Sequence, residues 1–207
     1  QVLTAAGQAQ AWAEGWEAED AIGSLCAQAS RRDRLEIVTG DRDLVQLVRD
    51  PWVRMLFTRR GVSDLDELDE ARVHEKYGVP ASRYSDFAIL RGDPSDALPG
   101  VQGVGEKTAR ALVLAYPSLE DLTRDAAGER RSRAILKRSP SLRARIAGAA
   151  GYIEAMREVV PIRTDLEVEI VRPQRDDGKL DPLASRLRLT GPVRRLREAL
   201  ASAKRGR

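Results

Sequence analysis

The stretch DPSDALPGVQGVGEKTA, Asp93 to Ala109, places two carboxylates directly before a glycine-punctuated turn and the start of a helix. Gly100, Gly103 and Gly105 lack a Cβ, so the backbone can turn tightly there and approach a ligand closely. The N–H groups that open the following helix carry partial positive charge and suit a phosphate. The stretch therefore predicts a helix–hairpin–helix motif that grips DNA phosphates, with an ordinary glycine-rich turn between two helices as the alternative.

Two further acidic clusters lie upstream, each where an expected element begins or ends. Glu17, Glu19 and Asp20 precede small and apolar residues at helical spacing, which predicts a helix that begins near residue 18. Residues 35–38 read as a short buried strand, and Asp41 and Asp43 follow it at the carboxyl end, where open α/β sheets place their ligands. These acids are therefore candidates for a shared site.

Seven carboxylates in three clusters would repel one another strongly without a counter-ion. Hard oxygen ligands of this kind suit Mg²⁺ or Mn²⁺, and two such ions about 4 Å apart can stabilise both the attacking and the leaving oxygen in phosphoryl transfer. The alternative is helix capping, which acidic residues favour at helix N-termini and which applies above all to Glu19 and Asp43.

Four motifs carry a family resemblance, in the same order as in that family. They are Glu17 to Gly23, Thr39 to Asp43, Lys76 to Pro80, and Gly92 to Ala109. The chain from about Trp12 to Leu166 resembles the 5′ nuclease domain of bacterial DNA polymerase I and its stand-alone flap-endonuclease relatives. The resemblance implies a structure-specific 5′-3′ exonuclease and flap endonuclease that hydrolyses DNA at 5′ ends and 5′ flaps in replication and repair, by a two-metal mechanism with Mg²⁺ or Mn²⁺.

The resemblance also implies roles for individual residues. By motif, the metal ligands are Glu17, Glu19, Asp20, Asp41, Asp43, Asp93 and Asp96, with catalysis assigned to Asp41, Asp43, Asp93 and Asp96. The hairpin residues expected to bind DNA are Gly100, Gly103, Gly105, Lys107 and Thr108. Related hairpins also hold a monovalent cation such as K⁺ through backbone carbonyls, which here are those of Pro99, Val101 and Val104.

The chain departs from the family pattern in two places. The family usually has Glu-Ala-Asp-Asp where this chain has Glu17 to Asp20 with glutamate at position 19. Family members also carry, before the first motif, a leading strand with a metal-binding aspartate and an arch with a catalytic lysine and arginine. The chain opens at Gln1 in what looks like the middle of a helix, so we expect a fragment of a longer protein. If nothing precedes Gln1, feeble or absent nuclease activity is expected.

Charge is divided unevenly along the 207 residues. Residues 1–100 hold 12 Lys and Arg against 18 Asp and Glu, and residues 101–207 hold 23 against 14, within a net charge of +3. An acidic first half and a basic second half suit a metal site followed by phosphate contacts. Solvated helix faces are the alternative. The two densest basic groups are Arg130, Arg131, Arg133, Lys137, Arg138, Arg143 and Arg145, and Arg194, Arg195, Arg197, Lys204, Arg205 and Arg207.

Composition excludes several classes of site. With a single histidine, His74, the chain lacks the residues for a zinc site or a histidine-based triad, and a lone Cys26 forbids an internal disulfide and is expected in the core. No apolar run approaches the roughly 20 residues that span a bilayer. A monomeric protein of the bacterial cytoplasm, associated with the nucleoid and not with a membrane, is expected.

The expected fold is α/β, with a PIN-like, resolvase-like core around a mostly parallel sheet, followed by a helical DNA-binding subdomain. Residues 1–80 are assigned to the core, 81–165 to the helix–hairpin–helix region, and 166–207 to a strand, a linker and a basic helix. Expected strands are 53–58 and 166–171, and the linker is 173–182. Expected helices are 64–77 after an acidic connection, 82–90, 108–116, 118–125 and 141–160.

Two other functions stay open. One is a non-catalytic helix–hairpin–helix module that binds DNA after its acids have lost their metals. The other is a PIN-like ribonuclease, which shares the clusters at Glu17 and Asp41 but has no need of the hairpin.

Overall fold

The structure is a computed structural model that describes residues 1–30, 32–130 and 132–205. Arg131 and Arg207, which belong to the basic groups expected to contact phosphate, lie outside the described residues, as do the side chains of Lys204 and Arg205. The chain forms two compact units. The first comprises Gln1–Ala21 and Leu166–Arg207, and the second comprises Ile22–Asp165.

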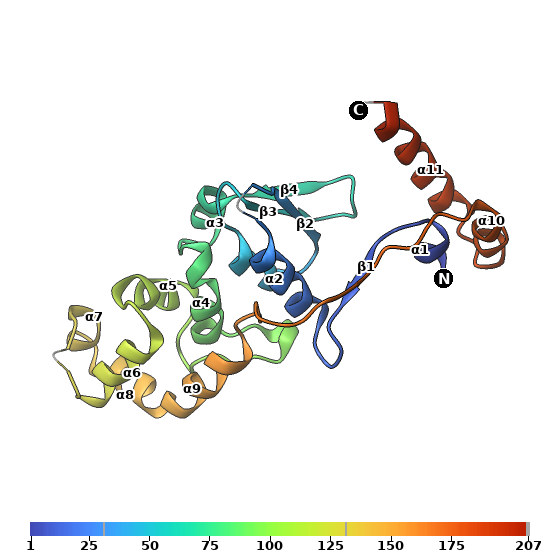
Figure 1. The fold of residues 1–207 in the computed structure, drawn as a ribbon. Coiled ribbons are helices and arrows are strands. Elements are labelled where there is room, and N and C mark those ends of the chain that lie inside the picture. The colour runs from blue at the N-terminus through green and yellow to red at the C-terminus, as the bar shows by residue number, and fades with distance from the viewer. Residues whose placement is uncertain (31, 131, 206–207) are drawn as a thin grey trace. The chain divides into compact units, whose positions relative to one another are not determined.

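The second unit holds a three-stranded sheet and most of the helices (Figure 1). Its strands are β2 (Leu35–Thr39), β3 (Val53–Thr58) and β4 (Leu65–Leu68), in that spatial order. Its helices are α2 (Ala18–Gln28, most of which lies in this unit), α3 (Glu70–Tyr77), α4 (Tyr84–Arg91), α5 (Glu106–Ala115), α6 (Leu119–Ala127), α7 (Ala134–Lys137), α8 (Pro140–Gly148) and α9 (Ala150–Val159), with 3₁₀ turns η1 (Asp43–Leu47), η2 (Ala81–Arg83) and η3 (Pro94–Asp96).

The sheet is mixed, which corrects the expectation of a mostly parallel one. β2 and β3 pair in parallel with Leu35 opposite Val53, whereas β3 and β4 are antiparallel with Met55 opposite Leu68. β4 was not expected because its pattern is inverted: Leu65 is exposed and Asp66 is buried. Lys76 Nζ donates to Asp66 Oδ2 at 2.8 Å, and this ion pair makes burial of the acid tolerable.

Most helices follow the expected positions because local signals define their ends. Asp69 caps α3 by accepting a hydrogen bond from the N–H of Arg72, and Gly78 ends it in the left-handed conformation at φ 70°. Ser118 caps α6 in the same way. Two expectations are wrong. The spacing of Leu44, Val45, Leu47 and Val48 predicts a helical face, but Asp43–Leu47 form only the short 3₁₀ turn η1. The helix expected over 141–160 is interrupted at Ala149, between α8 and α9.

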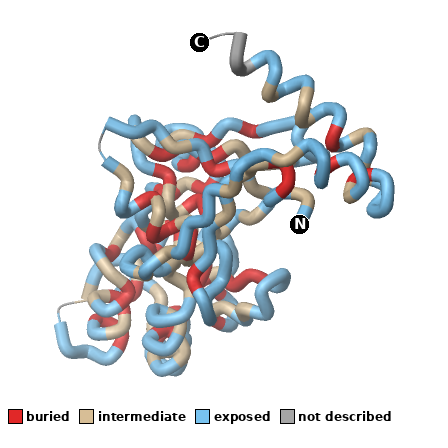
Figure 2. The backbone as a smooth tube through the Cα atoms, turned by 45° about the vertical axis from the view of Figure 1, so that its right-hand side comes forward, coloured by how far each residue is buried: buried red, intermediate tan, exposed pale blue. Residues whose placement is uncertain are grey.

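The core of the second unit joins the sheet to the helices. α4 supplies five fully or almost fully buried residues, Tyr84 and Phe87 to Leu90, and contacts η1, α5 and α9. Figure 1 shows α4 between the sheet and the group of helices α5 to α9, and Figure 2 shows buried segments throughout this interior. Cys26 is buried, as expected, and His74 is exposed on α3.

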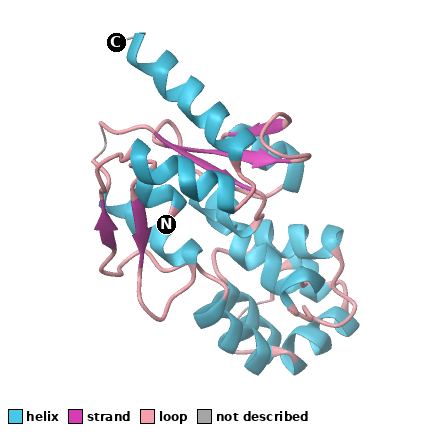
Figure 3. Cartoon of the chain, turned by 90° about the vertical axis from the view of Figure 1, so that its right-hand side faces the viewer, coloured by secondary structure: helices cyan, strands magenta, loops and turns pink. Residues whose placement is uncertain are grey.

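The first unit combines the two ends of the chain. β1 (Gln10–Trp12) pairs antiparallel with β5 (Glu169–Val171), and α1 (Val2–Ala5) packs on α10 (Asp177–Arg186), followed by α11 (Thr190–Arg205). Figure 3 shows these two strands as a pair of magenta arrows that point in opposite directions. The expected linker over 173–182 is wrong, because Asp176 caps α10 and buried Leu180 anchors it, and the helix continues through Pro182.

Candidate metal and nucleic-acid sites

An acidic pocket of about 320 Å³ lies beside the end of β2 in the second unit. Asp41, Asp43 and Asp96 line it, together with Gly40, Arg42 and Ser95. Asp41 and Asp43 follow β2, whereas Asp96 belongs to η3, more than fifty residues later. Folding thus brings together carboxylates from two motifs that are distant in the sequence.

Hydrogen bonds between residues two positions apart shape the part of the pocket that follows β2. Thr39, the last residue of β2, accepts the N–H of Asp41 on its hydroxyl at 3.0 Å, and Asp41 Oδ1 accepts the N–H of Asp43 at 3.0 Å. These bonds turn the chain out of the strand and hold the two aspartates at its carboxyl end. Asp43 then opens η1, whose Leu44 and Val45 are buried and anchor the turn in the core.

Asp93 is buried behind the second part of the pocket. Its Oδ1 accepts the Ser95 hydroxyl at 2.5 Å and the Ser95 N–H at 3.1 Å, and its Oδ2 accepts Arg91 Nη2 at 3.0 Å. Arg42 Nη2 lies 3.5 Å from both carboxylate oxygens. Both oxygens of Asp93 are therefore engaged by protein groups, while Asp96 is exposed at the rim.

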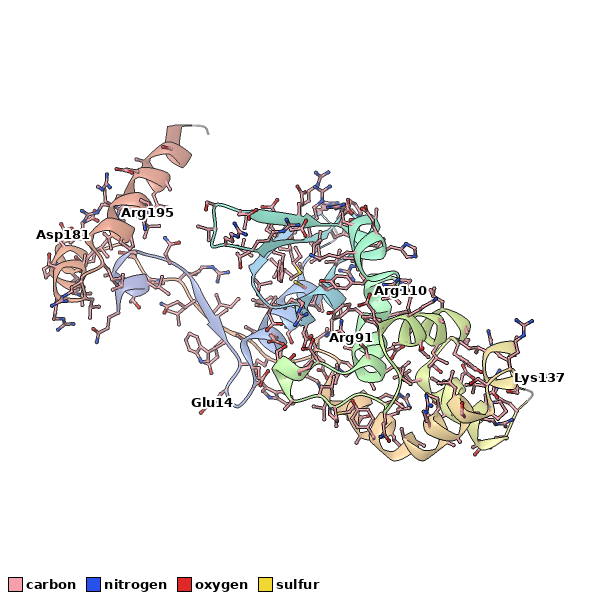
Figure 4. All side chains as sticks on the ribbon, turned by 180° about the vertical axis from the view of Figure 1, so that it is seen from behind. Glu14, Arg91, Arg110, Lys137, Asp181 and Arg195 are labelled. Carbon is pink, nitrogen blue, oxygen red and sulfur yellow. The ribbon has the colours of Figure 1, made fainter. Side chains whose placement is uncertain are left out.

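The two arginines hold Asp93 differently. Arg91 is fixed: its side chain is 18% exposed, its Nε donates to the carbonyl of Gly92 at 3.0 Å, and its guanidinium lies 4.9 Å from the Phe87 ring centre. Figure 4 shows Arg91 at the end of α4. Arg42 is 45% exposed, and its contacts to Asp93 and to the Ser95 hydroxyl are 3.3–3.5 Å long. Arg42 is the more readily displaced of the two.

The pKa values of Asp43 and Asp93 are shifted in opposite directions. Burial, together with the neighbouring charges of Asp96, Asp41 and Asp93, raises the pKa of Asp43 to about 6, and Arg42 only partly offsets this. Burial also disfavours the charged form of Asp93, but the bonds from Ser95 and the charges of Arg42 and Arg91 outweigh it and hold the pKa of Asp93 below its usual range. A cation in the pocket would relieve the repulsion at Asp43.

The chemistry of this donor set fits a hard divalent cation. Its side chains offer carboxylate oxygens without sulfur or imidazole. Burial, together with the neighbouring carboxylates, disfavours the charged form of Asp43, and a bound cation would favour it. In the part of the chain that the structure describes, no three Asp, Glu, His or Cys side chains lie close enough together to enclose an ion. The pocket is therefore not closed around a metal position.

The acids at the start of α2 belong to the first compact unit. Glu19 and Asp20 are half-buried in the first turn of α2, and Glu17 is exposed just before it. Asp20 Oδ2 accepts the N–H of Glu17 at 3.4 Å, which is a capping contact. Their convergence with Asp41 and Asp43 stays a prediction.

The hairpin joins η3 to α5 and is anchored by two buried valines. Val101 and Val104 are each 3% exposed, whereas Gly103, Gly105 and Lys107 face solvent and Thr108 is half-buried. The N–H of Val101 donates to the carbonyl of Leu90 at 3.0 Å, which fixes the loop to α4. Three of the five residues expected to contact DNA are thus exposed, and their contact with DNA stays a prediction.

Gly100 has a structural role at this site. Its N–H donates to the Tyr152 hydroxyl at 3.0 Å, and that hydroxyl donates to the carbonyl of Ile89 at 3.1 Å. At φ 71° its backbone passes so close to Gly92 that a Cβ would stand 2.6 Å from the Gly92 nitrogen. The expected contact of Gly100 with DNA therefore competes with an internal bond.

Of the three carbonyls expected at a monovalent cation, that of Val101 accepts the N–H of Val104 at 2.9 Å. This bond closes the turn around Gly103. Cation binding by Pro99, Val101 and Val104 stays a prediction.

Sequence reasoning missed the arginines of these sites. Arg42 stands inside the Thr39 to Asp43 motif and Arg91 directly before Gly92, so both were visible as cations beside predicted ligands. The pairing of Arg42 with Asp93 joins positions 51 residues apart, and no local sequence pattern predicts such a contact.

The fold consists of a resolvase-like α/β region followed by a bundle of short helices, and this combination defines the class of protein. Residues 1–78 match the 5′-3′ exonuclease N-terminal resolvase-like domain, and residues 79–181 match the 5′-3′ exonuclease C-terminal SAM fold. The chain belongs to the 5′-3′ exonuclease family. The expected α/β, resolvase-like core followed by a helical subdomain is confirmed.

Individual proteins agree with this assignment. A 5′-3′ exonuclease of Mycobacterium tuberculosis (strain ATCC 25618 / H37Rv) is 40% identical over 213 residues, covering 97% of this chain and 65% of the relative. The zinc-bound structure of T5 5′-exonuclease has a TM-score of 0.55 at 16% identity and covers 70% of this chain and 50% of that one. The catalytic core of Rad2 in complex with DNA substrate has a TM-score of 0.51 at 14% identity, with coverages of 88% and 60%.

The chain thus spans about two thirds of the length of the curated relative. The expectation of a segment before Gln1 stays a prediction. No helix in the described residues is both long and apolar enough to cross a membrane.

Proposed function

We propose that this chain is a divalent-metal-dependent 5′ nuclease that hydrolyses DNA phosphodiesters as a 5′-3′ exonuclease and flap endonuclease. The observation that carries the proposal is the pocket in which Asp41 and Asp43, from one motif, meet Asp96 from another. Membership of the 5′-3′ exonuclease family supports it. DNA with 5′ ends or 5′ flaps is the proposed substrate, in replication and repair, for a monomer associated with the nucleoid.

Asp41, Asp43 and Asp96 are the proposed holders of Mg²⁺ or Mn²⁺, with Asp93 beside them. Glu17, Glu19 and Asp20, at the start of α2, are proposed to contribute as well. When bound, such ions lower the pKa of a water molecule and offset charge on the phosphate and the leaving oxygen. The zinc-bound T5 5′-exonuclease supports a divalent ion at this fold. The protein's own part is to hold the carboxylates at the end of β2 and on η3, and the hydrogen bonds from Ser95 together with Arg42 and Arg91 favour the ionised form of Asp93.

The hairpin is the proposed grip on the DNA backbone. Gly103, Gly105 and Lys107 are exposed, so their backbone N–H groups and the Lys107 ammonium are the proposed contacts to phosphate. Contacts of this kind fix position on DNA without reading bases. K⁺ held by the carbonyls of Pro99, Val101 and Val104 would add charge beside the same phosphate. The Rad2 core in complex with DNA substrate supports DNA as the ligand.

A DNA-binding module without catalysis is the second candidate. It is favoured by the contacts of Asp93, whose two carboxylate oxygens already bind Ser95 and Arg91. On this alternative, the acidic pocket is a set of turn-forming residues and only the hairpin contacts DNA.

Metal binding and DNA cleavage, measured separately, distinguish these functions. Binding of Mn²⁺ is followed by electron paramagnetic resonance, and cleavage of a labelled 5′-flap DNA and of single-stranded RNA is followed with Mn²⁺ or EDTA. Asp96→Asn is the test variant, and Asp64→Asn, an equally exposed aspartate outside the pocket, is its matched control. We expect the wild type and the control to bind Mn²⁺ and cleave the flap, and Asp96→Asn to be impaired in both.

Each other result has its own meaning. Flap binding without Mn²⁺ binding identifies the non-catalytic module, and preferential cleavage of RNA identifies a ribonuclease. Equal Mn²⁺ affinity in the wild type and Asp96→Asn removes the pocket from the proposal. Mn²⁺ binding without cleavage would support the metal site and refute the proposed nuclease activity of this chain.

A further inference from the structure

The guanidinium of Arg145 lies against the hairpin turn, although Arg145 is 42 residues away along the chain. It projects from α8, and its Nη1 donates to the carbonyl of Gly103 at 3.4 Å. The next residue, Ile146, is completely buried, as is most of Leu142 one turn earlier. The helix that carries Arg145 is therefore anchored in the core, and the position of the guanidinium beside the loop follows from that anchor.

Gly103 leaves the space that the guanidinium occupies. A Cβ at position 103 would stand 2.9 Å from Arg145 Nη1 and 3.2 Å from its Cζ, closer than a side chain normally approaches. Gly103 also has φ 74°, a left-handed conformation that favours glycine. The glycine thus serves two purposes: it closes the turn and it admits an arginine from another helix to the solvent-facing side of the loop.

The guanidinium has donors to spare at this position. Arginine carries five N–H donors, and a single long bond to Gly103 uses only one of them. Among the described residues, no carboxylate lies within ion-pair distance of Arg145. Arg143, on the same helix, is different: its Nε and Nη2 donate to the carbonyls of Ala126 and Asp125 at 3.1 and 2.9 Å and tie α8 to α6.

We propose that Arg145 is a phosphate-binding residue of the hairpin, and that Gly103 positions it. The proposal rests on the proposed DNA-binding function of the loop. Arginine suits the role because its planar fork presents two parallel donors to a phosphate and stays charged. Arg145 then adds a side-chain contact to the backbone N–H groups of Gly103 and Gly105, next to Lys107 on the same exposed face.

Fluorescence anisotropy with a labelled 5′-flap duplex in EDTA tests the proposal without cleavage. Arg145→Ala is the test variant, and Arg60→Ala, which removes an equally exposed charge from the β3–β4 connection, is the matched control. We expect Arg145→Ala to weaken binding several-fold and to lower the slope of log affinity against log salt by about 0.9, the value for one lost duplex phosphate contact. Arg145→Lys is expected to lie between, because it keeps the charge and loses the fork.

A double-mutant cycle with Gly103→Ala tests the positioning role. Since a Cβ at 103 displaces the guanidinium, Arg145→Ala should weaken binding much less in the Gly103→Ala background than in the wild type. Additive effects would overturn the positioning role. Circular dichroism establishes that Gly103→Ala is folded, and if it is not, the Arg145 variants still decide whether Arg145 contacts DNA.

Failure of this proposal is distinguishable from failure of the proposed function. If Lys107→Ala weakens binding and Arg145→Ala does not, or changes it no more than Arg60→Ala does, the role of Arg145 is refuted and the hairpin keeps its function. If neither Lys107→Ala nor Arg145→Ala changes affinity, the hairpin is not the DNA-binding surface and both proposals fall.

Discussion

Gly100→Ala should destabilise the second unit strongly, because Gly100 and Gly92 form a backbone crossing behind the acidic pocket. At position 100 a Cβ would stand 2.6 Å from the carbonyl carbon and oxygen of Arg91 and from the Gly92 nitrogen. These are backbone atoms at the end of α4, so no flexible side chain can move aside to make room. Gly100 also has φ 71°, where alanine is strained.

The two costs can be separated in magnitude. A non-glycine residue in the left-handed region costs roughly 1–2 kcal/mol, and forcing a backbone shift to accommodate an overpacked atom costs about 1–3 kcal/mol more. Gly100→Ala is therefore expected to lower the free energy of unfolding by about 2–5 kcal/mol. Gly61→Ala isolates the strain, because Gly61 has φ 80° and no atom within 4 Å of its Cβ position.

Urea unfolding, followed by far-ultraviolet circular dichroism, measures both variants. The midpoint should fall at an unchanged slope, and the loss should be clearly larger for Gly100→Ala than for Gly61→Ala. Equal losses in the two variants would show that the crossing relaxes freely and would refute the steric reasoning.

Three further predictions concern charge. Because the pKa of Asp43 is raised to about 6, its folded state favours the protonated carboxyl, so its contribution to stability is complete below pH 4 and lost as pH rises to 6. Over that interval the metal-free wild type should lose about 1–2 kcal/mol of unfolding free energy relative to Asp43→Asn, a value reduced because Asp43 is partly exposed. Thermal or urea unfolding measures this loss, and a free-energy difference that stays constant with pH would contradict the raised pKa. Arg42→Gln should bind Mn²⁺ several-fold more tightly than the wild type in calorimetric titration, because it removes a cation from the pocket; weaker binding would show that Arg42 supports the site. Asp125→Ala should lower the free energy of unfolding in urea by about 3–5 kcal/mol, because Asp125 is completely buried and accepts hydrogen bonds from the Tyr116 hydroxyl and the Arg133 N–H at 2.7 Å each. Glu129 is exposed, so the control Glu129→Ala should cost less than about 1 kcal/mol. Similar losses in the two variants would contradict the importance of this buried network.

Local pattern was enough to find most helices of this chain and two of its sheet strands. Gly78 after an apolar helical face, and Ser118 before one, define ends whose signals lie within a few residues. β3 was expected at the observed bounds because its side chains are apolar and flanked by turn formers. β4 escaped because Asp66 faces inward, and its burial depends on Lys76 and Arg59, which come from two other parts of the chain.

The sequence by itself determined which residues are candidates for the proposed chemistry: the aspartates after β2, those at and before η3, and the glycines of the hairpin. Spacing and residue type predict these candidates because the residues of each motif lie within a single turn or strand. Only the tertiary structure decided how they are used. It engaged Asp93 with Arg91 and Arg42, assigned Gly100 to a backbone crossing, and brought Arg145 to Gly103. Arg42 lies 51 positions from Asp93, and Arg145 lies 42 positions from Gly103. The energies of these contacts depend on a geometry that exists only after the core has formed.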